Sequence, residues 1–273
     1  LAARHSTYSQ QFIVPAEKLD TLFNLAISES RKRTLKFIDL PAEESFTLEY
    51  VTGKPWSGYN WYKGNSSSLI QLNTDLPVSI DRILDLASHE GYPGHHVFNT
   101  LIEDNLVSER QWIEYTIYPL FSPQSLIAEG SANYGIDVAF PFEERVNFES
   151  EILWPVAGLP ITEVERYYKI QRILLQLSYA GNDIARGYFS GTYSDDQLVE
   201  LLQHYLLFSE DRAAQRLQFI KKYRSYIINY NYGRDLIADW VERQLGENTS
   251  EENRWKVFAE LLTFPRTASQ LLD

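Results

Sequence analysis

The feature that most constrains the fold is a helical repeat of apolar residues, which continues with few interruptions from residue 99 to residue 262. Side chains that recur every three or four positions form one buried face of an amphipathic helix. This pattern predicts helices over residues 99–105, 109–120, 124–138, 141–153, 161–189, 195–207, 210–227, 233–245 and 251–262, and earlier over 15–37 and 79–88. Ser108 with Gln111 and Ser194 with Gln197 have the spacing of a capping box, which marks a helix start.

One segment, residues 46–75, departs from the helical pattern. Residues 46–51 and 68–74 alternate apolar and polar side chains, and turn-forming and aromatic residues lie between them. Alternation of this kind is typical of half-buried strands. We therefore expect a mainly α fold with one small antiparallel sheet of two or three strands, placed just before the helix over residues 79–88. Because no linker or internal repeat interrupts the chain, we expect a single helical domain over residues 1–273.

Composition excludes several kinds of protein. The chain has 37 acidic and 25 basic residues, a formal charge of −12 and no basic cluster, which argues against a nucleic-acid partner. No apolar run is long enough to predict a membrane span. With no cysteine, any zinc must be bound by histidine and carboxylate. With no methionine either, we expect that part of the natural N-terminal region is missing.

The strongest functional signal is a cluster of histidines. Three of the five histidines, His89, His95 and His96, lie in the segment HEGYPGHH at residues 89–96, and Glu90 follows the first of them. In the zinc-peptidase signature HExxH, two histidines one helical turn apart bind the metal and the glutamate acts on a water molecule. Three neighbouring histidines can also be an incidental surface cluster, but the adjacent glutamate and the Pro-Gly step favour a metal site.

The spacing of these histidines requires a break in the helix. In a straight helix, His89 and His96 would lie about 10 Å apart along the axis, too far for one zinc ion with bonds of about 2 Å. Pro93 cannot donate a backbone hydrogen bond, and Gly94 accepts conformations that other residues avoid. We therefore expect a bend that brings His95 toward His89 as a second metal ligand, with His96 as the alternate to His95.

A third metal ligand and the catalytic groups are expected from other segments. Glu129 lies among small and apolar residues of a predicted helix, where a carboxylate is costly unless it is paired or bound to a metal. Glu90 is then the expected general base, which takes a proton from a water molecule activated by zinc. Tyr230, in a tyrosine-rich stretch, is the first candidate for the donor that stabilises a developing oxyanion. His204 is a second candidate without local support.

The segment HEGYPGHH, with residues 70–75 before it and Ala128-Glu129-Gly130 after it, resembles a bacterial family catalogued as domain of unknown function 885. Its members carry an HE-x-x-PGHH segment followed by an EGW-like helix. They are regarded as predicted zinc peptidases, distantly similar to the helical gluzincin carboxypeptidases. The resemblance covers residues 46–233, and it implies a helical metallopeptidase-like fold.

The resemblance also implies roles for individual residues. His89, one histidine of the pair at residues 95 and 96, and Glu129 would bind zinc, with Glu90 catalytic. The Gly-His step of the related carboxypeptidases corresponds to Gly94 and His95. Tyr230 matches the tyrosine of a late Tyr-x-x-Gly element. Two departures concern the pocket wall and this tyrosine: Ser131 stands where many members have tryptophan, and the Pro-Gly-Gln that often opens the late element is absent.

Together these observations predict a zinc metallopeptidase-like hydrolase that acts on a peptide or a small amide. Residues 68–74 are the expected edge strand along which an extended substrate would pair. A zinc hydrolase of non-peptide esters or amides has the same sequence features. A different class also remains open, namely a non-catalytic helical binding or structural protein with a degenerate metal site. Substrate identity and oligomeric state do not follow from the sequence.

Overall fold

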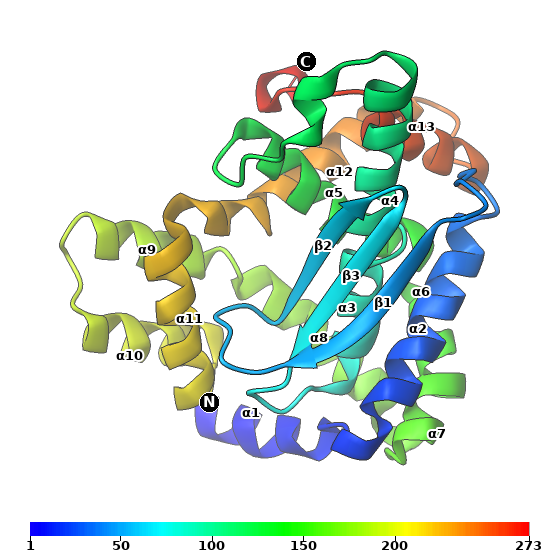
Figure 1. Cartoon of the computed structure of the whole chain (residues 1–273). Coiled ribbons are helices and arrows are strands. Elements are labelled where there is room, and N and C mark those ends of the chain that lie inside the picture. The colour runs from blue at the N-terminus through cyan, green and yellow to red at the C-terminus, as the bar shows by residue number, and fades with distance from the viewer. Residues whose placement is uncertain (273) are drawn as a thin grey trace.

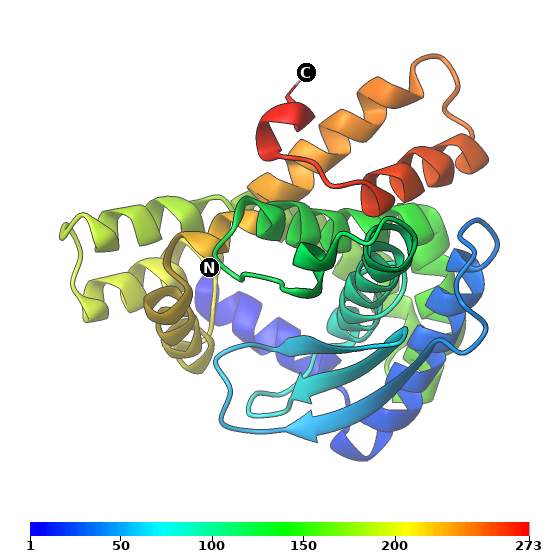
Figure 2. The same ribbon diagram turned by 45° about the horizontal axis from the view of Figure 1, so that its top comes forward.

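A small sheet covers one side of a mainly helical protein, as the sequence predicted. The computed structural model describes residues 1–272. Its three strands are β1 (Ser45–Val51), β2 (Gly58–Gly64) and β3 (Ser67–Asn73). Figure 1 shows them in front of the helices α3 (Ile80–Glu90) and α4 (His95–Ile102), and the tilted view of Figure 2 shows the sheet as a separate layer.

The sheet is mixed, whereas the sequence predicted an antiparallel one. Its strand order is β1-β3-β2, with β2 antiparallel and β1 parallel to β3. β2 and β3 form a hairpin through a tight turn in which Asn65 and Ser66 both have positive φ, a turn type that suits strand twist. β3, which buries Ile70 and Leu72, is the central strand of the sheet. β1 pairs with the edge of β3 that faces away from β2. Alternation identified the strands, but it contains no information on their order.

The predicted helices are largely confirmed, although two of the long ones are divided. The prediction over residues 141–153 corresponds to α6 and a following π-helical turn, and that over 161–189 corresponds to two helices. A capping box at Ser194 and Gln197 begins α10 as expected. The remaining helices are α1 (Ala2–Ser9), α2 (Leu19–Thr34), α5 (Pro123–Ala139), α6 (Phe142–Phe148), α7 (Trp154–Ala157), α8 (Val164–Leu177), α9 (Ala180–Phe189), α10 (Asp195–Leu206), α11 (Glu210–Tyr223), α12 (Tyr232–Leu245) and α13 (Glu251–Thr263).

The helix predicted over residues 109–120 does not form. Only one 3-10 turn, Ile113–Thr116, occurs there, and no helix begins at Ser108. Ile113 and Ile117 expose 72% and 71% of their surface, so their helical spacing does not reflect a buried face. A short helix without a core to pack against gains too little to offset its nucleation cost.

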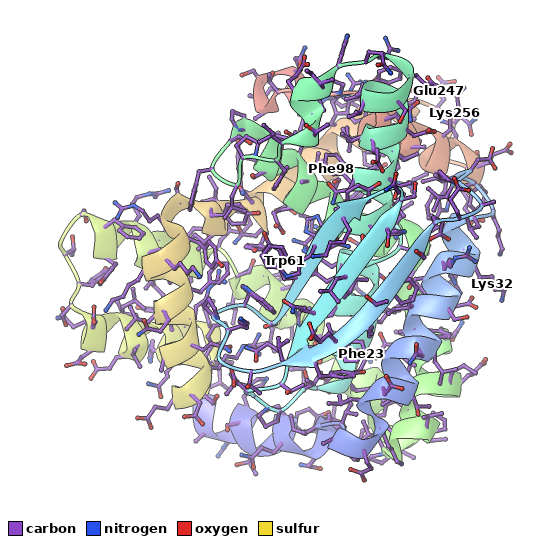
Figure 3. The ribbon with its side chains drawn as sticks, viewed as in Figure 1. Phe23, Lys32, Trp61, Phe98, Glu247 and Lys256 are labelled. Atoms are coloured by element: carbon purple, nitrogen blue, oxygen red, sulfur yellow. The ribbon has the colours of Figure 1, made fainter. Side chains whose placement is uncertain are left out.

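The main core lies between the sheet and the helices behind it. Leu22, Phe23 and Ala26 form one buried stripe of α2, and Figure 3 shows Phe23 beside β1. Deeper in the core, α5 and α12 approach so closely that a Cβ added at Gly130 would lie 2.5 Å from the carbonyl oxygen of Gly233. The two backbones are therefore in direct contact at this crossing.

A second apolar cluster lies to one side of this core. It is formed mainly by α9, α10 and α11, which project together on the left in Figures 1 and 2. Leu198 and Leu202 on α10 and Ile220 on α11 are fully buried in it. Within residues 1–272, none of the helices combines the length and the apolar character needed to cross a membrane.

Candidate metal centre

The expected break in the helix occurs between α3, which ends at Glu90, and α4, which begins at His95. The chain turns back against the end of α3, and the N–H of Gly94 donates to the carbonyl oxygen of Ser88 at 3.0 Å. A Cβ at Gly94 would lie only 1.9 Å from the carbonyl oxygen of His89. The turn is therefore so tight that only glycine fits at position 94.

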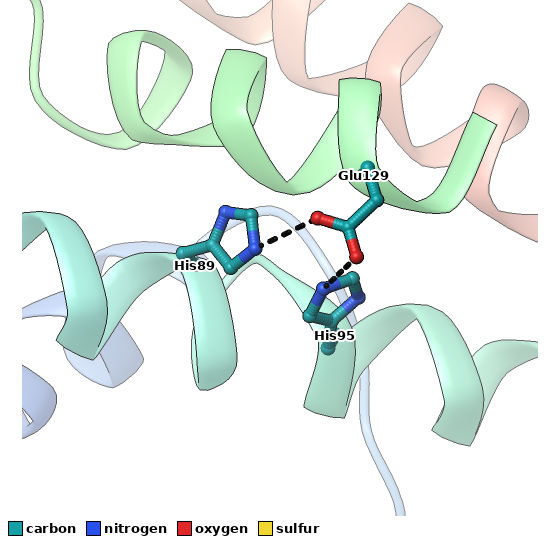
Figure 4. Close-up of side chains that lie close together, drawn as sticks. All are labelled: His89, His95 and Glu129. Atoms are coloured by element: carbon teal, nitrogen blue, oxygen red, sulfur yellow. Dashed lines mark ion pairs between the residues drawn. The ribbon is translucent and has the colours of Figure 1, made fainter. Parts of the chain in front are cut away.

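This turn brings His89 and His95 together, and α5 places Glu129 opposite them (Figure 4). The Nε2 atom of His89 is 3.1 Å from Oε2 of Glu129, and Nε2 of His95 is 3.5 Å from Oε1. Their potential ligand atoms all lie within 4.8 Å of one another. The three side chains point toward one common position, so the group could hold a metal ion.

The donor set and its geometry fit a divalent ion. Ligand bonds of about 2.0–2.1 Å place tetrahedral ligand atoms about 3.3 Å apart, close to the two separations above. Oε2 of Glu129 is buried without a hydrogen bond among the described residues, as expected for an atom reserved for a metal. Burial opposes ionisation of Glu129, but the nearby His95 and His89 lower its pKa well below the usual range. A carboxylate is therefore available as a ligand at neutral pH.

Two residues that we did not select from the sequence support this group. Asn133 lies one helical turn after Glu129, and its Oδ1 is 3.1 Å from Nδ1 of His89. A hydrogen bond at Nδ1 leaves the lone pair of Nε2 free for a metal. The hydroxyl of Tyr226 donates to Oε1 of Glu129 at 2.7 Å. Asn133 could have been predicted from the sequence, because a residue four positions after Glu129 lies on the same face of the helix. No such spacing distinguishes Tyr226 from the other tyrosines around it.

Glu90 lies beside the three candidate ligands and is only 4% exposed. Its carboxylate has no hydrogen bond or ion pair with any of residues 1–272, and burial raises its pKa. A Cβ added at Gly58 on β2 would lie 2.8 Å from its Oε1 atom, so the sheet closes over this carboxylate. Asn60, also on β2, donates to the backbone oxygen of Glu90 at 2.7 Å, which ties the end of α3 to the sheet.

Tyr230 lies next to the metal centre, whereas His204 is exposed on α10. The ring of Tyr230 stacks near that of His89, with centroids 6.3 Å apart. Burial and the charge of Glu129 raise the pKa of Tyr230 well above its usual value, so its hydroxyl remains a donor. The ring of Tyr230 therefore lies beside the candidate metal ligands, whereas no contact of His204 connects it to them.

His96 lies outside the metal group. Its ring is fully buried, with Nδ1 2.8 Å from the hydroxyl of Ser68 and Nε2 3.0 Å from Oε2 of Glu44. Both ring nitrogens are therefore occupied within the protein. Glu44 also accepts hydrogen bonds from Tyr92 and, at 2.6 Å, from Arg31. This buried carboxylate connects both sides of the turn at residues 93 and 94.

These different surroundings predict different outcomes for the two neighbouring histidines. His95→Ala should weaken zinc binding by roughly 100-fold or more, because it removes one of the three candidate metal ligands. His96→Ala should retain zinc but lower the free energy of unfolding by roughly 2–4 kcal/mol, because Glu44 loses a buried partner. Zinc titration against a competing chelator and denaturant unfolding would measure both. Equal loss of zinc in the two variants would contradict the assignment.

Glu44 should also make stability depend on pH. Burial opposes its ionisation, but hydrogen bonds from His96, Tyr92 and Arg31 outweigh this and lower its pKa from 4.5 to about 2. A pKa that is lower in the folded state stabilises the fold above pH 4.5, and this contribution is lost as the pH falls toward 2. Between pH 6 and pH 3 the loss should be about 2 kcal/mol.

Urea unfolding of the metal-free protein at both pH values would measure this loss. Glu44→Gln cannot titrate, so it should lose about 2 kcal/mol less than the wild type over the same interval. A chelator in every sample keeps the protein metal-free, so that release of metal at low pH does not change the measured free energy of unfolding. Identical losses in the two proteins would refute the assignment of this pH dependence to Glu44.

Comparison with known proteins supports the fold and leaves the activity open. The sequence matches no model of a known protein family and no curated protein. The structure is similar to that of a presumed lipoprotein from Colwellia psychrerythraea, with a TM-score of 0.67 and 15% sequence identity. The similarity covers 96% of this chain and 46% of that one, so the chain spans about half the length of its structural relative. At this identity the similarity concerns the fold alone.

Proposed function

We propose that this protein is a zinc-dependent hydrolase that cleaves peptide or related amide bonds, in line with the family resemblance of its HEGYPGHH segment. The observation that carries the proposal is the convergence of His89, His95 and Glu129 beside the unpaired, buried carboxylate of Glu90. A structural metal site needs only the ligands. The additional carboxylate, which has no partner among the described residues, is what a hydrolytic site requires.

The proposed mechanism assigns each step to a residue of the chain. Zinc, held by His89, His95 and Glu129, would polarise a substrate carbonyl and make water more acidic. Glu90 accepts the proton of the attacking water and then delivers it to the leaving amine. Its raised pKa brings the carboxyl closer to neutral pH and so favours this exchange. The hydroxyl of Tyr230 donates to the oxyanion that develops on the carbonyl.

The sheet offers a site for an extended substrate, although not on the strand predicted from the sequence. Residues 68–73 of that segment belong to β3, which pairs with a strand on each side and cannot accept a third. β2 is the edge strand nearest Glu90, and Figure 3 shows Trp61 on it. Tyr59 and Trp61 pack with centroids 4.6 Å apart. We therefore assign substrate pairing to β2, where aromatic side chains favour apolar residues in the substrate.

The proposal is tested by replacing Glu90 with glutamine, which preserves shape but removes the base. We expect turnover of a peptide library to fall by about 10²- to 10⁴-fold while one zinc ion per chain is retained. Elemental analysis and a chelator-sensitive peptide assay would give both quantities. Glu149→Gln is a matched control, because Glu149 is equally buried but pairs with Arg145.

The outcomes separate an enzyme from a binding protein. Loss of turnover in Glu90→Gln, with activity retained in Glu149→Gln, would support the hydrolase. Zinc-loaded wild-type protein without activity toward peptides, amides or esters would overturn it in favour of a non-catalytic metal-binding protein. Cleavage of esters alone would support a hydrolase but overturn its assignment as a peptidase.

A further inference from the structure

Two arginines on α11, Arg212 and Arg216, lie one helical turn apart without a carboxylate partner. No acidic group of residues 1–272 lies within 4 Å of either guanidinium. The protein carries a net charge of −12, so carboxylates are abundant elsewhere. The two guanidiniums lie over aromatic rings. The guanidinium carbon of Arg212 is 4.4 Å from the ring centroid of Phe208, and that of Arg216 is 5.0 Å from the ring centroid of Phe219. These two cations are held in place while their hydrogen-bonding edges remain free for a ligand.

Aromatic contacts connect this pair to the proposed active site. The ring of Phe219 lies 5.9 Å from that of Tyr230, which in turn lies 6.3 Å from His89. The rings of Phe219 and Tyr230, tilted by 59° to each other, therefore lie between Arg216 and His89. Figure 1 shows α11 beside the sheet, on the side of β2.

A third arginine, Arg82 on α3, lies near the same region but pairs with Asp85 at 3.2 Å. Arg82 lies seven residues before His89, which places both on one face of the helix. Arg212 is exposed and Arg216 is half-buried, and the charged groups that face Arg212 are Arg82, Asp81 and Arg216. Positive charges that repel one another are retained at a cost, which a bound anion would offset.

We propose that Arg212 and Arg216 bind a carboxylate of the substrate, so that the enzyme cleaves peptides close to a free C terminus. This inference rests on the proposed function. A guanidinium recognises a carboxylate through two parallel hydrogen bonds, and two guanidiniums one turn apart can contact both of its oxygens. The remaining surface is strongly acidic and repels such a group, so binding at this cluster would also orient the peptide.

The test uses one N-acetylated tetrapeptide of alanine and phenylalanine, prepared as the free acid and as the C-terminal amide. Calorimetry on the metal-free protein measures binding, and hydrolysis is measured with zinc. Wild-type protein should bind the acid about 10- to 100-fold more tightly than the amide, and Arg216→Gln should abolish most of this difference. Arg212→Gln is a second variant in case the first does not fold. Arg186→Gln is the matched control, because Arg186 is exposed and pairs with Asp183.

The two readouts distinguish failure of this inference from failure of the proposed function. A protein that cleaves both peptides, binds them equally and does not respond to Arg216→Gln would overturn the carboxylate site and leave the hydrolase intact. A preference for the acid that appears only with zinc and survives in both variants would place the carboxylate on the metal and overturn the inference. A preference in the metal-free protein without hydrolysis of either peptide would support the arginine site and refute the peptidase.

Discussion

Replacing Glu129 with glutamine should weaken zinc binding by roughly 100- to 1000-fold and abolish metal-dependent turnover. The amide keeps the size of the side chain and can still accept a hydrogen bond from Tyr226, so the fold should survive. The substitution removes the negative charge of Glu129, which attracts the metal ion and faces His89 and His95. A structural zinc site contributes about 10–16 kcal/mol in total, so the loss of one strong ligand costs several kcal/mol. Titration against a fluorescent zinc chelator would measure the change.

Glu149→Gln again provides the control, because it removes a buried carboxylate far from the metal group in sequence. Its ion pair with Arg145 at 2.8 Å is structural, so this variant should lose stability and retain zinc. If Glu129→Gln bound zinc as tightly as the wild type, Glu129 would not be a ligand. The proposed active site would then lack its third protein donor.

Gly94→Ala should prevent correct formation of the turn and lower the free energy of unfolding by at least about 3 kcal/mol. The added Cβ would lie 1.9 Å from the carbonyl oxygen of His89 and 2.4 Å from that of Ser88. Neither atom can move away without unwinding the end of α3. Because His89 itself is displaced, zinc affinity should fall together with stability. Thermal unfolding with and without zinc would separate the two losses.

Gly181→Ala is the matched control, since it makes the same substitution in a helix. The new Cβ would contact only the end of the Leu206 side chain at 3.3 Å, which can rotate away. Alanine is also preferred over glycine within helices, so stability should change by less than about 1 kcal/mol. A Gly94→Ala protein as stable as this control would contradict the described turn.

Much of the candidate site could be predicted because its chemistry lies in short segments. Two of the three grouped side chains lie in residues 89–96, and Pro93 with Gly94 indicated the necessary break. The choice between His95 and His96 could not be made from spacing, because the two are adjacent. It depends on Glu44, more than 50 residues earlier, which occupies His96 from another part of the fold.

The limits of prediction for the fold have a similar cause. Helical periodicity identified most helices, since each buries its own apolar face, but residues 109–120 show the same period without a core to cover. The order of the strands depends on which strand pairs with a neighbour at both edges, and that becomes visible only once α3 lies behind β3.

The direct backbone contact between α5 and α12 restricts how the proposed active site could adapt to a substrate. Glu129 and Tyr230 lie close to Gly130 and Gly233, where no side chain separates the helices. Rotamer changes therefore cannot widen this wall, and a bulky substrate cannot be admitted from that direction. Any widening has to come from another side, such as β2, the edge strand near Glu90, which pairs with a strand on one side only. Variants that broaden substrate range should accordingly arise in β2.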